Sequence, residues 1–352
     1  MKIAVITCHN NPNYIRAYTL REALLKQKVH KISILKNRKQ GLLRYPEVML
    51  KLIKLRFTVN PDVYILTFRG YEILGFTRFI SFRKKLIFDE FINPIEWLEE
   101  PHQNKIKKLV PKKLLKLYYR RLLKKVDVIL ADTSGHAKYS SRLMNIPINK
   151  YRALPVSTDE YIFKPDNKIK KLKGFNVFYY GEKMTPLHGL DVIMDATKYL
   201  KNYPINFLIV GGSESTRNLV KKQDNPRVEY KNWIAFELFP YTIRKHQLCL
   251  GGPFGKSTQA NYVITGKTYQ FLACGAPTIV GNTQVSDDFK DKVNSLSVDL
   301  GDSKQLAHQI LWAYKNQNKL AKIGNSGHQL YMKKYSIDVL TSQLLSILNG
   351  LA

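Results

Sequence analysis

The chain is poor in cysteine and in acidic residues. Its three cysteines, Cys8, Cys249 and Cys274, are far apart and form no C-x-x-C pair, which argues against a disulfide framework and against a zinc site. The 352 residues include 27 Asp and Glu against 57 Lys and Arg, a formal net charge of +30. A charge of this size favours an anionic partner: phospholipid headgroups, nucleic acid or a phosphorylated substrate. Composition does not choose among these three.

Long apolar runs and a dinucleotide fingerprint are also missing. No stretch of about 18 apolar residues occurs, so the sequence predicts no membrane-spanning helix. The first residues, MKIAVITCHNNP, lack the apolar core and the cleavage site of a signal peptide, and we expect a cytoplasmic protein. The loop after the first predicted strand has no G-x-G-x-x-G, which argues against an ordinary dinucleotide-binding domain.

Short β-like runs alternate with longer amphipathic stretches along the whole chain, a pattern typical of parallel α/β architecture. The pattern occurs once in each half of the sequence. The predicted strands cover residues 2–7, 29–35, 61–68, 84–91, 126–133, 151–156, 175–181, 205–212, 228–231, 248–252, 277–281 and 294–300. A chain of this length exceeds one ordinary core, so we expect two domains.

A polar segment at 163–174, FKPDNKIKKLKG, is the best candidate for a linker between the domains. We therefore predict an N-terminal domain over 1–165 and a C-terminal domain over 174–335. The last stretch, 336–352, has the pattern of an amphipathic helix and is treated as a separate element.

One basic segment is exceptional. Residues 104–125 contain ten Lys or Arg and no acid, and their leucines and tyrosines give an apolar side. Such a helix suits an anionic membrane surface. It equally suits a surface helix that packs its leucines on the sheet and leaves its lysines in solvent. Pro111 is expected to break the helix or to begin it.

Ligands bind beyond the carboxyl ends of strands in open parallel sheets, so the loops there are the candidate sites. In the first half these are Asn10, Asn11 and Arg16 after the first strand, Asp89 and Glu90 after the fourth, and His136 after the fifth. The first group suits a sugar or phosphate, or else caps a helix. The acids suit a general base or a salt bridge. A lone histidine suits catalysis or a structural role.

In the second half the strand ends carry glycines and cations. They are Gly181, Lys183, His188 and Gly189 after the first strand of this half, Gly211 and Gly212 after the second, and Lys256 and Lys267 beyond the fourth. Helix N-termini with nearby cations suit a diphosphate. Glycine allows a ligand to approach the backbone closely. Each lysine alone has the alternative of a solvent-exposed role.

Five segments resemble, in order and spacing, the family-4 GT-B glycosyltransferases. They are VDVILADTSGHAKY (126–139), LPVSTDEYIFKP (154–165), FYYGEKMTPLHGLDVIMDATKYL (178–200), KTYQFLACGAPTIVG (267–281) and NSLSVDLGD (294–302). The resemblance is strongest over 126–316 and weaker before it. It implies two Rossmann-like domains facing a cleft, with a C-terminal helix that crosses back to the N-terminal domain.

The resemblance also implies an activity. Such enzymes move a sugar, usually a hexose, from a nucleotide-sugar donor with retained configuration and without a divalent metal. The donor, expected to be UDP- or GDP-linked, is a substrate, and no cofactor is expected. We therefore expect a retaining transferase acting on a cell-envelope glycan or a lipid-phosphate-linked acceptor, peripheral at the inner face of the cell membrane through the basic segment.

The residues assigned to this activity come from the matched segments and from the strand ends described above. Catalytic roles fall to Asp89, His136, Lys183 and Lys267. Acceptor binding falls to Asn10, Asn11 and Arg16. Donor binding falls to Gly181, His188, Gly189, Gly211, Gly212, Trp233, Ile234, Lys256, Thr268 and Gln270.

The chain departs from the family pattern at its usual glutamate pair, where Tyr262 and Gln270 stand. His188 replaces the usual lysine, and Glu182 or Lys183 the usual arginine. PFGKSTQANYVITGK (253–267) and PLHG (186–189) resemble a sub-branch with such changes, so these residues are read as substitutes. Two alternatives stay open: a degenerate scaffold that binds a glycan or partner, and a nucleic-acid-binding protein, although no nucleic-acid module is present. An epimerase on the same fold fits the motifs less well.

Overall fold

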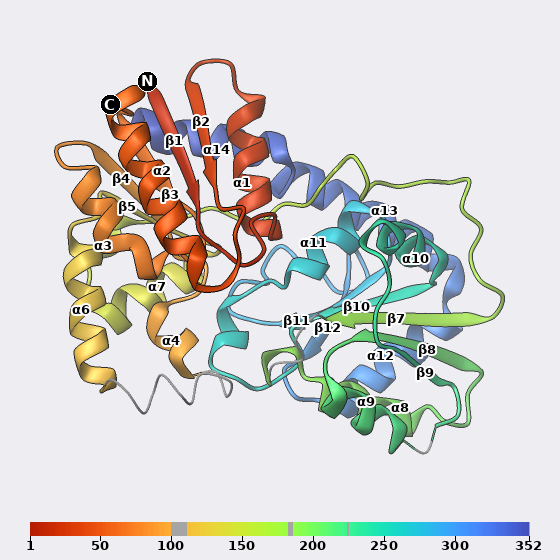
Figure 1. Cartoon of the computed structure of the whole chain (residues 1–352). Helices are drawn as coiled ribbons and strands as arrows, with labels where there is room; N and C mark the ends of the chain where they lie inside the picture. Colours follow the sequence, from red (N-terminus) through yellow and green to blue (C-terminus); the bar gives the residue numbers. More distant parts are fainter. Residues whose placement is uncertain (100–110, 182–185, 224, 352) are drawn as a thin grey trace. The chain divides into compact units, whose positions relative to one another are not determined.

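The computed structural model describes residues 1–99, 111–181, 186–223 and 225–351. The chain forms two compact units (Figure 1). Unit 1 comprises Met1–Val156 and Ile337–Ala352, and unit 2 comprises Ser157–Ser336. Each unit is built around one parallel sheet.

The described strands of unit 1 form a six-stranded sheet in the order β2-β1-β3-β4-β5-β6, with every pair parallel. The strands are β1 (Lys2–Thr7), β2 (Lys31–Lys36), β3 (Val63–Leu66), β4 (Lys85–Asp89), β5 (Val128–Ala131) and β6 (Tyr151–Ala153). The helices are α1 (Ile15–Lys26), η1 (Gly41–Leu43), α2 (Arg44–Thr58), α3 (Tyr71–Ile80), α4 (Pro94–Glu99), α6 (Lys112–Lys124), α7 (Ser134–Met144), η3 (Ile148–Lys150) and α14 (Ile337–Asn349).

The described strands of unit 2 form a second six-stranded parallel sheet, in the order β12-β11-β10-β7-β8-β9. The strands are β7 (Phe175–Gly181), β8 (Ile205–Gly211), β9 (Val228–Lys231), β10 (Leu248–Gly252), β11 (Thr278–Asn282) and β12 (Leu296–Asp299). The helices are η4 (Pro186–His188), α8 (Leu190–Tyr199), α9 (Glu214–Lys221), η5 (Phe236–Leu238), α10 (Phe239–Lys245), η6 (Gln259–Tyr262), α11 (Gly266–Ala273), α12 (Ser303–Lys315) and α13 (Gln317–Lys334).

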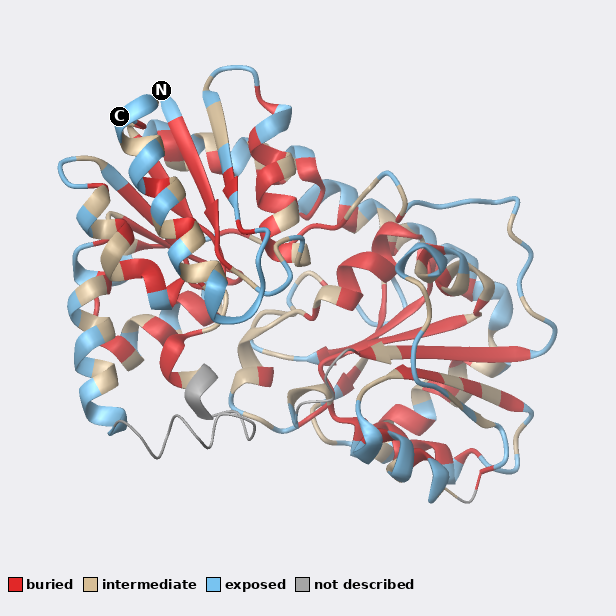
Figure 2. Ribbon diagram, in the orientation of Figure 1, coloured by how far each residue is buried: buried red, intermediate tan, exposed pale blue. Residues whose placement is uncertain are grey.

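The central strands are mostly buried, as Figure 2 shows in red. All residues of β3, β5 and β10 are buried. Helices cover both faces of a parallel sheet, so its strands are continuous apolar runs rather than alternating ones. This explains why KIAVIT, VDVILADT and similar runs predict the strands: each of the twelve predicted segments overlaps a strand of the structure. The prediction of a two-domain parallel α/β fold is confirmed.

The last helix, α14, belongs to the core of unit 1. Leu340, Leu344 and Leu348 are buried there with residues of β1 and α1. The Thr341 hydroxyl donates to the Ala23 carbonyl at 3.1 Å, and Lys26 pairs with Asp338 at 2.6 Å. The chain therefore returns to its first domain, as the expected GT-B architecture requires.

The division between the units falls after Val156, earlier than the boundary expected near residue 165. The reason is that the following segment is tied to unit 2. The Arg244 guanidinium donates to the carbonyls of Ile162 and Lys164, and the Leu172 amide donates to the Lys245 carbonyl. Part of the predicted linker is therefore fixed to α10 by hydrogen bonds.

The basic segment is described only from Pro111, and its predicted part at 104–110 lies outside the described residues. Pro111 is the N-cap of α6, so it begins the described helix. Leu122 and Leu123 pack on the core of unit 1, while Leu114 stays exposed. The structure thus shows the packed side of α6 that one of the two interpretations requires. None of the described helices is both long and apolar enough to cross a membrane.

Candidate functional site

The order of the sheet in unit 2 places a ligand-binding edge between β7 and β10. These two strands are neighbours, yet the chain continues from β7 to one side and from β10 to the other. Such a switch point leaves a crevice at the carboxyl ends of the strands. Those ends are Gly181 of β7 and Gly252 of β10.

Two loops meet closely at this edge. Gly189 precedes α8 in a left-handed conformation (φ 63°), and a Cβ atom there would lie 2.5 Å from the backbone of Phe254 and Gly255. A Cβ atom at Gly255 would lie 1.8 Å from the Pro186 carbonyl oxygen. Only glycine fits at these positions, so the P-L-H-G loop is held against the loop that follows β10.

This packing brings His188 and Lys267 together, although 79 residues separate them in sequence. The Lys267 ammonium lies 3.2 Å from His188 Nδ1 and 4.7 Å from the centre of the Tyr179 ring. Lys267 stands in the first turn of α11 and is almost completely buried. The sequence predicted that both residues face one ligand, and the structure makes them neighbours.

Burial disfavours charge on both groups. Desolvation lowers the pKa of Lys267 from 10.5 to about 7. Burial, and then the charge of Lys267, lowers the pKa of His188 well below 6.5. Because a charged lysine and a charged imidazole repel at this distance, a neutral His188 accepts a hydrogen bond from Lys267. Within the described residues no carboxylate lies within ion-pairing distance of Lys267, so an anionic ligand would restore the charge of the pair.

Gln270 replaces one of the glutamates expected at this site. Its side-chain oxygen accepts a hydrogen bond from the Tyr180 hydroxyl, and it is nearly buried. Tyr180 comes from β7, one strand residue before Gly181. The sequence did not point to Tyr180, because a tyrosine in a strand is ordinarily a core residue.

Other predicted donor residues have internal roles or lie apart from the pair. Thr268 is fully buried, and its hydroxyl lies 3.0 Å from that of Thr265. Gly211 is pressed against the Gly181 carbonyl, since a Cβ atom there would lie 2.4 Å from that oxygen. Gly212 contacts Thr216 of α9, and Lys256 is exposed with its methylene groups against Gly301. After β9, Trp233 is exposed and Ile234 is half-buried. Lys183 lies outside the described residues.

In unit 1 the predicted residues Arg16 and Asp89 bind each other. Arg16 Nη2 and Nε lie 2.8 Å and 3.0 Å from Asp89 Oδ1, and both side chains are buried. The second guanidinium nitrogen donates to the carbonyls of Leu154 and Pro155. Burial raises the pKa of the Asp89 carboxyl, and Arg16 opposes that shift. The pair therefore joins α1, β4 and the end of β6. Asp89 thus forms a salt bridge, which was the alternative to a role as general base, and its partner is an arginine.

His136 lies in a buried group of carboxylates that sequence reasoning found only in part. Its Nδ1 lies 2.7 Å from Asp132 Oδ1, and its Nε2 lies 3.8 Å from Glu96 Oε2. Glu90 accepts a hydrogen bond from the Ser140 hydroxyl on the same helix. These carboxylates outweigh desolvation and raise the pKa of His136 to about 9. Burial raises the pKa of Glu96 to about 7.

Three polar atoms of this group have no hydrogen-bond partner among the described residues: His136 Nε2, Glu90 Oε2 and Glu96 Oε2. Buried polar atoms normally find partners, so they are candidates for binding a water or a ligand hydroxyl. Glu96 was not predicted, because nothing in NPIEWLEE distinguishes it from a surface acid of a short helix. The described residues contain no cluster with the geometry of a metal site.

Stability should depend on pH through His136. The folded state holds the imidazole proton more tightly than the unfolded chain, with a pKa of about 9 against 6.5. The stabilisation is therefore complete below pH 6.5 and is lost as the pH rises to 9, by on the order of 3 kcal/mol. Urea unfolding of the natural protein and of His136→Gln at pH 7 and pH 9 measures it as the difference between the two, because Lys267, with its lowered pKa, adds a slope of opposite sign to both. His136→Gln should remove this slope, whereas an unchanged slope in that variant would show that another group titrates.

The two asparagines predicted for acceptor binding are exposed in the loop after β1. Asn10 accepts hydrogen bonds from the Gly41 amide and the Arg44 guanidinium. Asn11 accepts from the Asn13 amide and, through its carbonyl, from the Tyr14 amide at the start of α1. Both residues shape the loop, but neither side chain caps α1, whose N-cap is Tyr14 and has no side-chain cap hydrogen bond.

Comparison with solved structures decides the fold. The UDP complex of Anabaena Alr3699/HepE aligns with 99% of this chain and 100% of its own at 13% identity, with a TM-score of 0.72. Sucrose-phosphate synthase from Thermosynechococcus elongatus aligns over 100% and 99% at 12% identity and TM-score 0.78. A glycosyltransferase from Rickettsia africae aligns over 98% and 97% at 14% identity and TM-score 0.70.

The chain has the GT-B fold. Each alignment runs over nearly the full length of both chains, so both Rossmann-like units take part. No family model matches the sequence, and no curated protein matches it either. The GT-B fold is thus carried by a sequence that has diverged far from those of its structural relatives.

Proposed function

We propose that this protein is a retaining glycosyltransferase that moves a hexose from a UDP- or GDP-linked donor to a cell-envelope glycan or lipid-linked saccharide. One observation carries the proposal. His188 and Lys267 converge at the switch point of unit 2, the edge where doubly wound sheets bind nucleotides. The HepE structures that share the fold hold UDP and UDP-glucose, which favours a UDP-linked donor.

The chemistry of Lys267 suits a departing diphosphate. Without a ligand its pKa of about 7 leaves the buried amine only partly charged at neutral pH. A diphosphate beside it favours the protonated form, so charge appears where the leaving group develops its own. The N-terminus of α11 adds a positive partial charge. These groups fill the role for which other transferases use a divalent metal, and we propose that none is required.

The acceptor would meet the carboxyl edge of unit 1. His136 Nε2 lies 3.8 Å from Glu96 Oε2 but has no hydrogen-bond partner among the described residues, and the protonated imidazole can donate to a hydroxyl. Asp89 and Arg16 act on this edge as positioning residues, since their charged atoms bind each other and the backbone. The excess of basic residues and helix α6 support a peripheral place at the cytoplasmic membrane face.

Donor binding is tested by thermal unfolding with UDP, GDP and their sugar conjugates. A ligand present at a hundred times its Kd stabilises the folded state by about 2.7 kcal/mol. For a unit of this size the transition should rise by roughly 5 to 10 °C. UDP and UDP-sugars are expected to give the largest shift, and the anomer of the product, followed by NMR, then tests retention.

A matched variant makes this measurement specific. Gln270→Ala removes the partner of Tyr180 and should reduce the shift with UDP-sugar, while Gln284→Ala changes an amide on another loop of the same unit and should not. If no nucleotide raises the melting temperature of the natural protein, the transferase proposal fails. The alternative of a non-catalytic scaffold, which the missing glutamate pair supports, then takes its place.

A further inference from the structure

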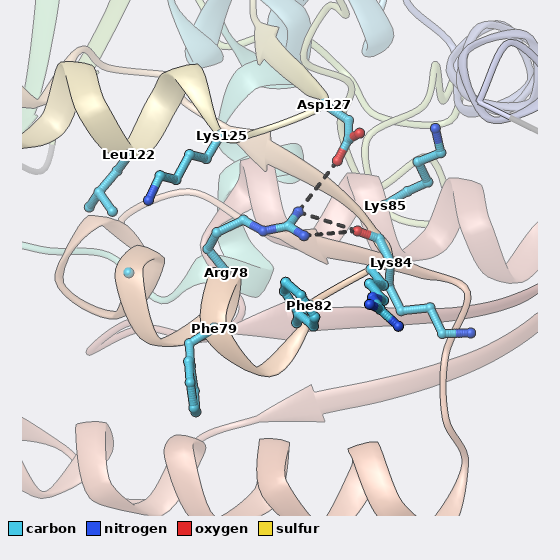
Figure 3. Close-up of a pocket in the computed structure, with 10 residues that line it drawn as sticks. Arg78, Phe79, Phe82, Lys84, Lys85, Leu122, Lys125 and Asp127 are labelled. Atoms are coloured by element: carbon cyan, nitrogen blue, oxygen red, sulfur yellow. Dashed lines mark hydrogen bonds and ion pairs between the residues drawn. The ribbon is translucent and has the colours of Figure 1, made fainter.

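A hollow of about 730 Å³ lies in unit 1 where β4 and β5 begin (Figure 3). Its lining includes Arg78, Phe79, Phe82, Arg83, Lys85 and Lys125. Because helices in this fold run opposite to the strands, the carboxyl ends of α2, α3 and α6 all come to this edge. The predicted substrate residues of unit 1 lie at the other end of the strands, so the hollow is separate from them.

The hollow is strongly cationic. Arg83, Lys85 and Lys125 are exposed, and within the described part of the chain no carboxylate lies within 4.0 Å of them. The one acid in the lining is Asp127. Its carboxylate accepts a hydrogen bond from the Leu86 amide, and its Oδ2 lies 3.5 Å from Arg78 Nη1. Lys84, also in the lining, pairs with Asp62 at 3.4 Å, so the side chains without an internal counter-charge are Arg83, Lys85 and Lys125. These three cations favour an anionic ligand.

Aromatic rings stand beside these cations. Phe79 and Phe82 are 76% and 63% exposed, and the Arg83 guanidinium lies 5.4 Å from the centre of the Phe82 ring. Phe57, in the last turn of α2, is 82% exposed. Its neighbour Arg56 donates to the Phe82 carbonyl, so the end of α2 borders the same hollow. Several exposed phenylalanines at one edge mark an interaction surface.

We infer that this hollow binds the phosphate of an anionic phospholipid in a bilayer, with the phenylalanines entering the boundary between headgroups and acyl chains. A soluble phosphate or a nucleic acid would satisfy the cations and leave the rings in water. A bilayer of anionic lipid satisfies both. The inference rests on the membrane partner proposed above and gives it a defined site, which is lined by Leu122 of α6 and by Lys125, the C-cap of that helix.

Co-sedimentation with vesicles tests the site, using phosphatidylcholine alone and phosphatidylcholine mixed with phosphatidylglycerol. The variant R83S/K85S/K125S should partition about 100-fold less onto the anionic vesicles, because each charge that is removed lowers partitioning by about five-fold. The variant F79S/F82S should lose at least about tenfold. All five side chains are exposed, so the melting temperature should stay unchanged in both variants.

The matched control is K221S/K222S/K322S, which removes three exposed charges from unit 2. It should bind within about twofold of the natural protein, because it removes the same charge and leaves every residue that lines the hollow in place. Equal losses in the control and in R83S/K85S/K125S would overturn the site in favour of net charge. Unchanged vesicle binding in F79S/F82S would overturn the entry of the phenylalanines into the bilayer.

Vesicle binding does not depend on transfer activity, so the two proposals fail separately. Each variant is also melted with UDP, and the shift should equal that of the natural protein. A missing UDP shift with intact vesicle binding counts against the transferase. An intact UDP shift with no preference for phosphatidylglycerol vesicles overturns the lipid site alone.

Discussion

Replacing Lys267 with methionine should lower kcat/KM for sugar transfer by about 10² to 10³, the range found when one preorganised charge is removed from a developing anion. Methionine keeps the unbranched side chain over Tyr179 and deletes the ammonium. Donor hydrolysis should fall together with transfer, because both pass through the departure of the same diphosphate. Initial rates with a UDP-sugar, followed by release of UDP, measure the effect.

The same change should not weaken the fold. Lys267 is almost completely buried, and burial lowers its pKa to about 7, which means that the folded state bears the cost of its charge. An apolar residue there is neutral or stabilising. A large loss of activity with an unchanged or raised melting temperature therefore identifies a binding group, since a structural lysine would lose both.

Lys256→Met is the matched control for this experiment. Lys256 follows β10 in the same unit but is exposed, with its methylenes against Gly301. It should lose less than about threefold in rate, because a solvated charge contributes little. Turnover of Lys267→Met equal to that of Lys256→Met would remove Lys267 from the site, and with it the main support for the proposed function.

Replacing Asp89 with alanine should destabilise unit 1 by about 3–5 kcal/mol, the largest effect on stability that we expect. The guanidinium of Arg16 is buried and loses its carboxylate partner, and an uncompensated buried charge is expensive. For a domain of this size the melting transition should fall by roughly 6 to 20 °C. Calorimetry is suited to the test, since the transition of unit 2 serves as an internal reference.

Two further variants show whether the pairing is responsible. The double variant R16M/D89L removes both charges and should recover part of the loss, since apolar pairs replace buried ion pairs without large cost. Asp338→Ala breaks the exposed pair with Lys26 and should change stability by less than about 1 kcal/mol. If Asp89→Ala melts like the natural protein, the pair does not hold this edge together.

The size of that effect bears on how Asp89 contributes to function. The carboxylate lies at the end of β4 and also accepts a hydrogen bond from the backbone amide of Phe68, which follows β3. Its charged partner reaches the carbonyls of Leu154 and Pro155. Four segments at the carboxyl edge of unit 1 thus meet at one buried ion pair. A loss of activity in an Asp89 variant therefore needs to be compared with its stability before a direct chemical role is assigned.

Local sequence patterns were sufficient to predict the secondary-structure elements and the fold class. Buried parallel strands need apolar residues on both faces, so runs such as VDVILADT and LCLGG identify them without knowledge of their neighbours. Local pattern also predicts the basic helix and the glycines that follow the strands. The alternation of strands and helices in each half then fixed a pair of parallel sheets, because short crossovers permit few other arrangements.

The contacts between polar side chains, in contrast, depend on how distant segments pack. Arg16 and Asp89 are 73 residues apart, His188 and Lys267 are 79 apart, and Glu90 reaches Ser140 across 50 residues. Local periodicity places a residue on a face or at a strand end, but not in contact with a given partner. That contact depends on strand order, on the approach of glycine loops and on rotamers, which are set when the whole unit packs.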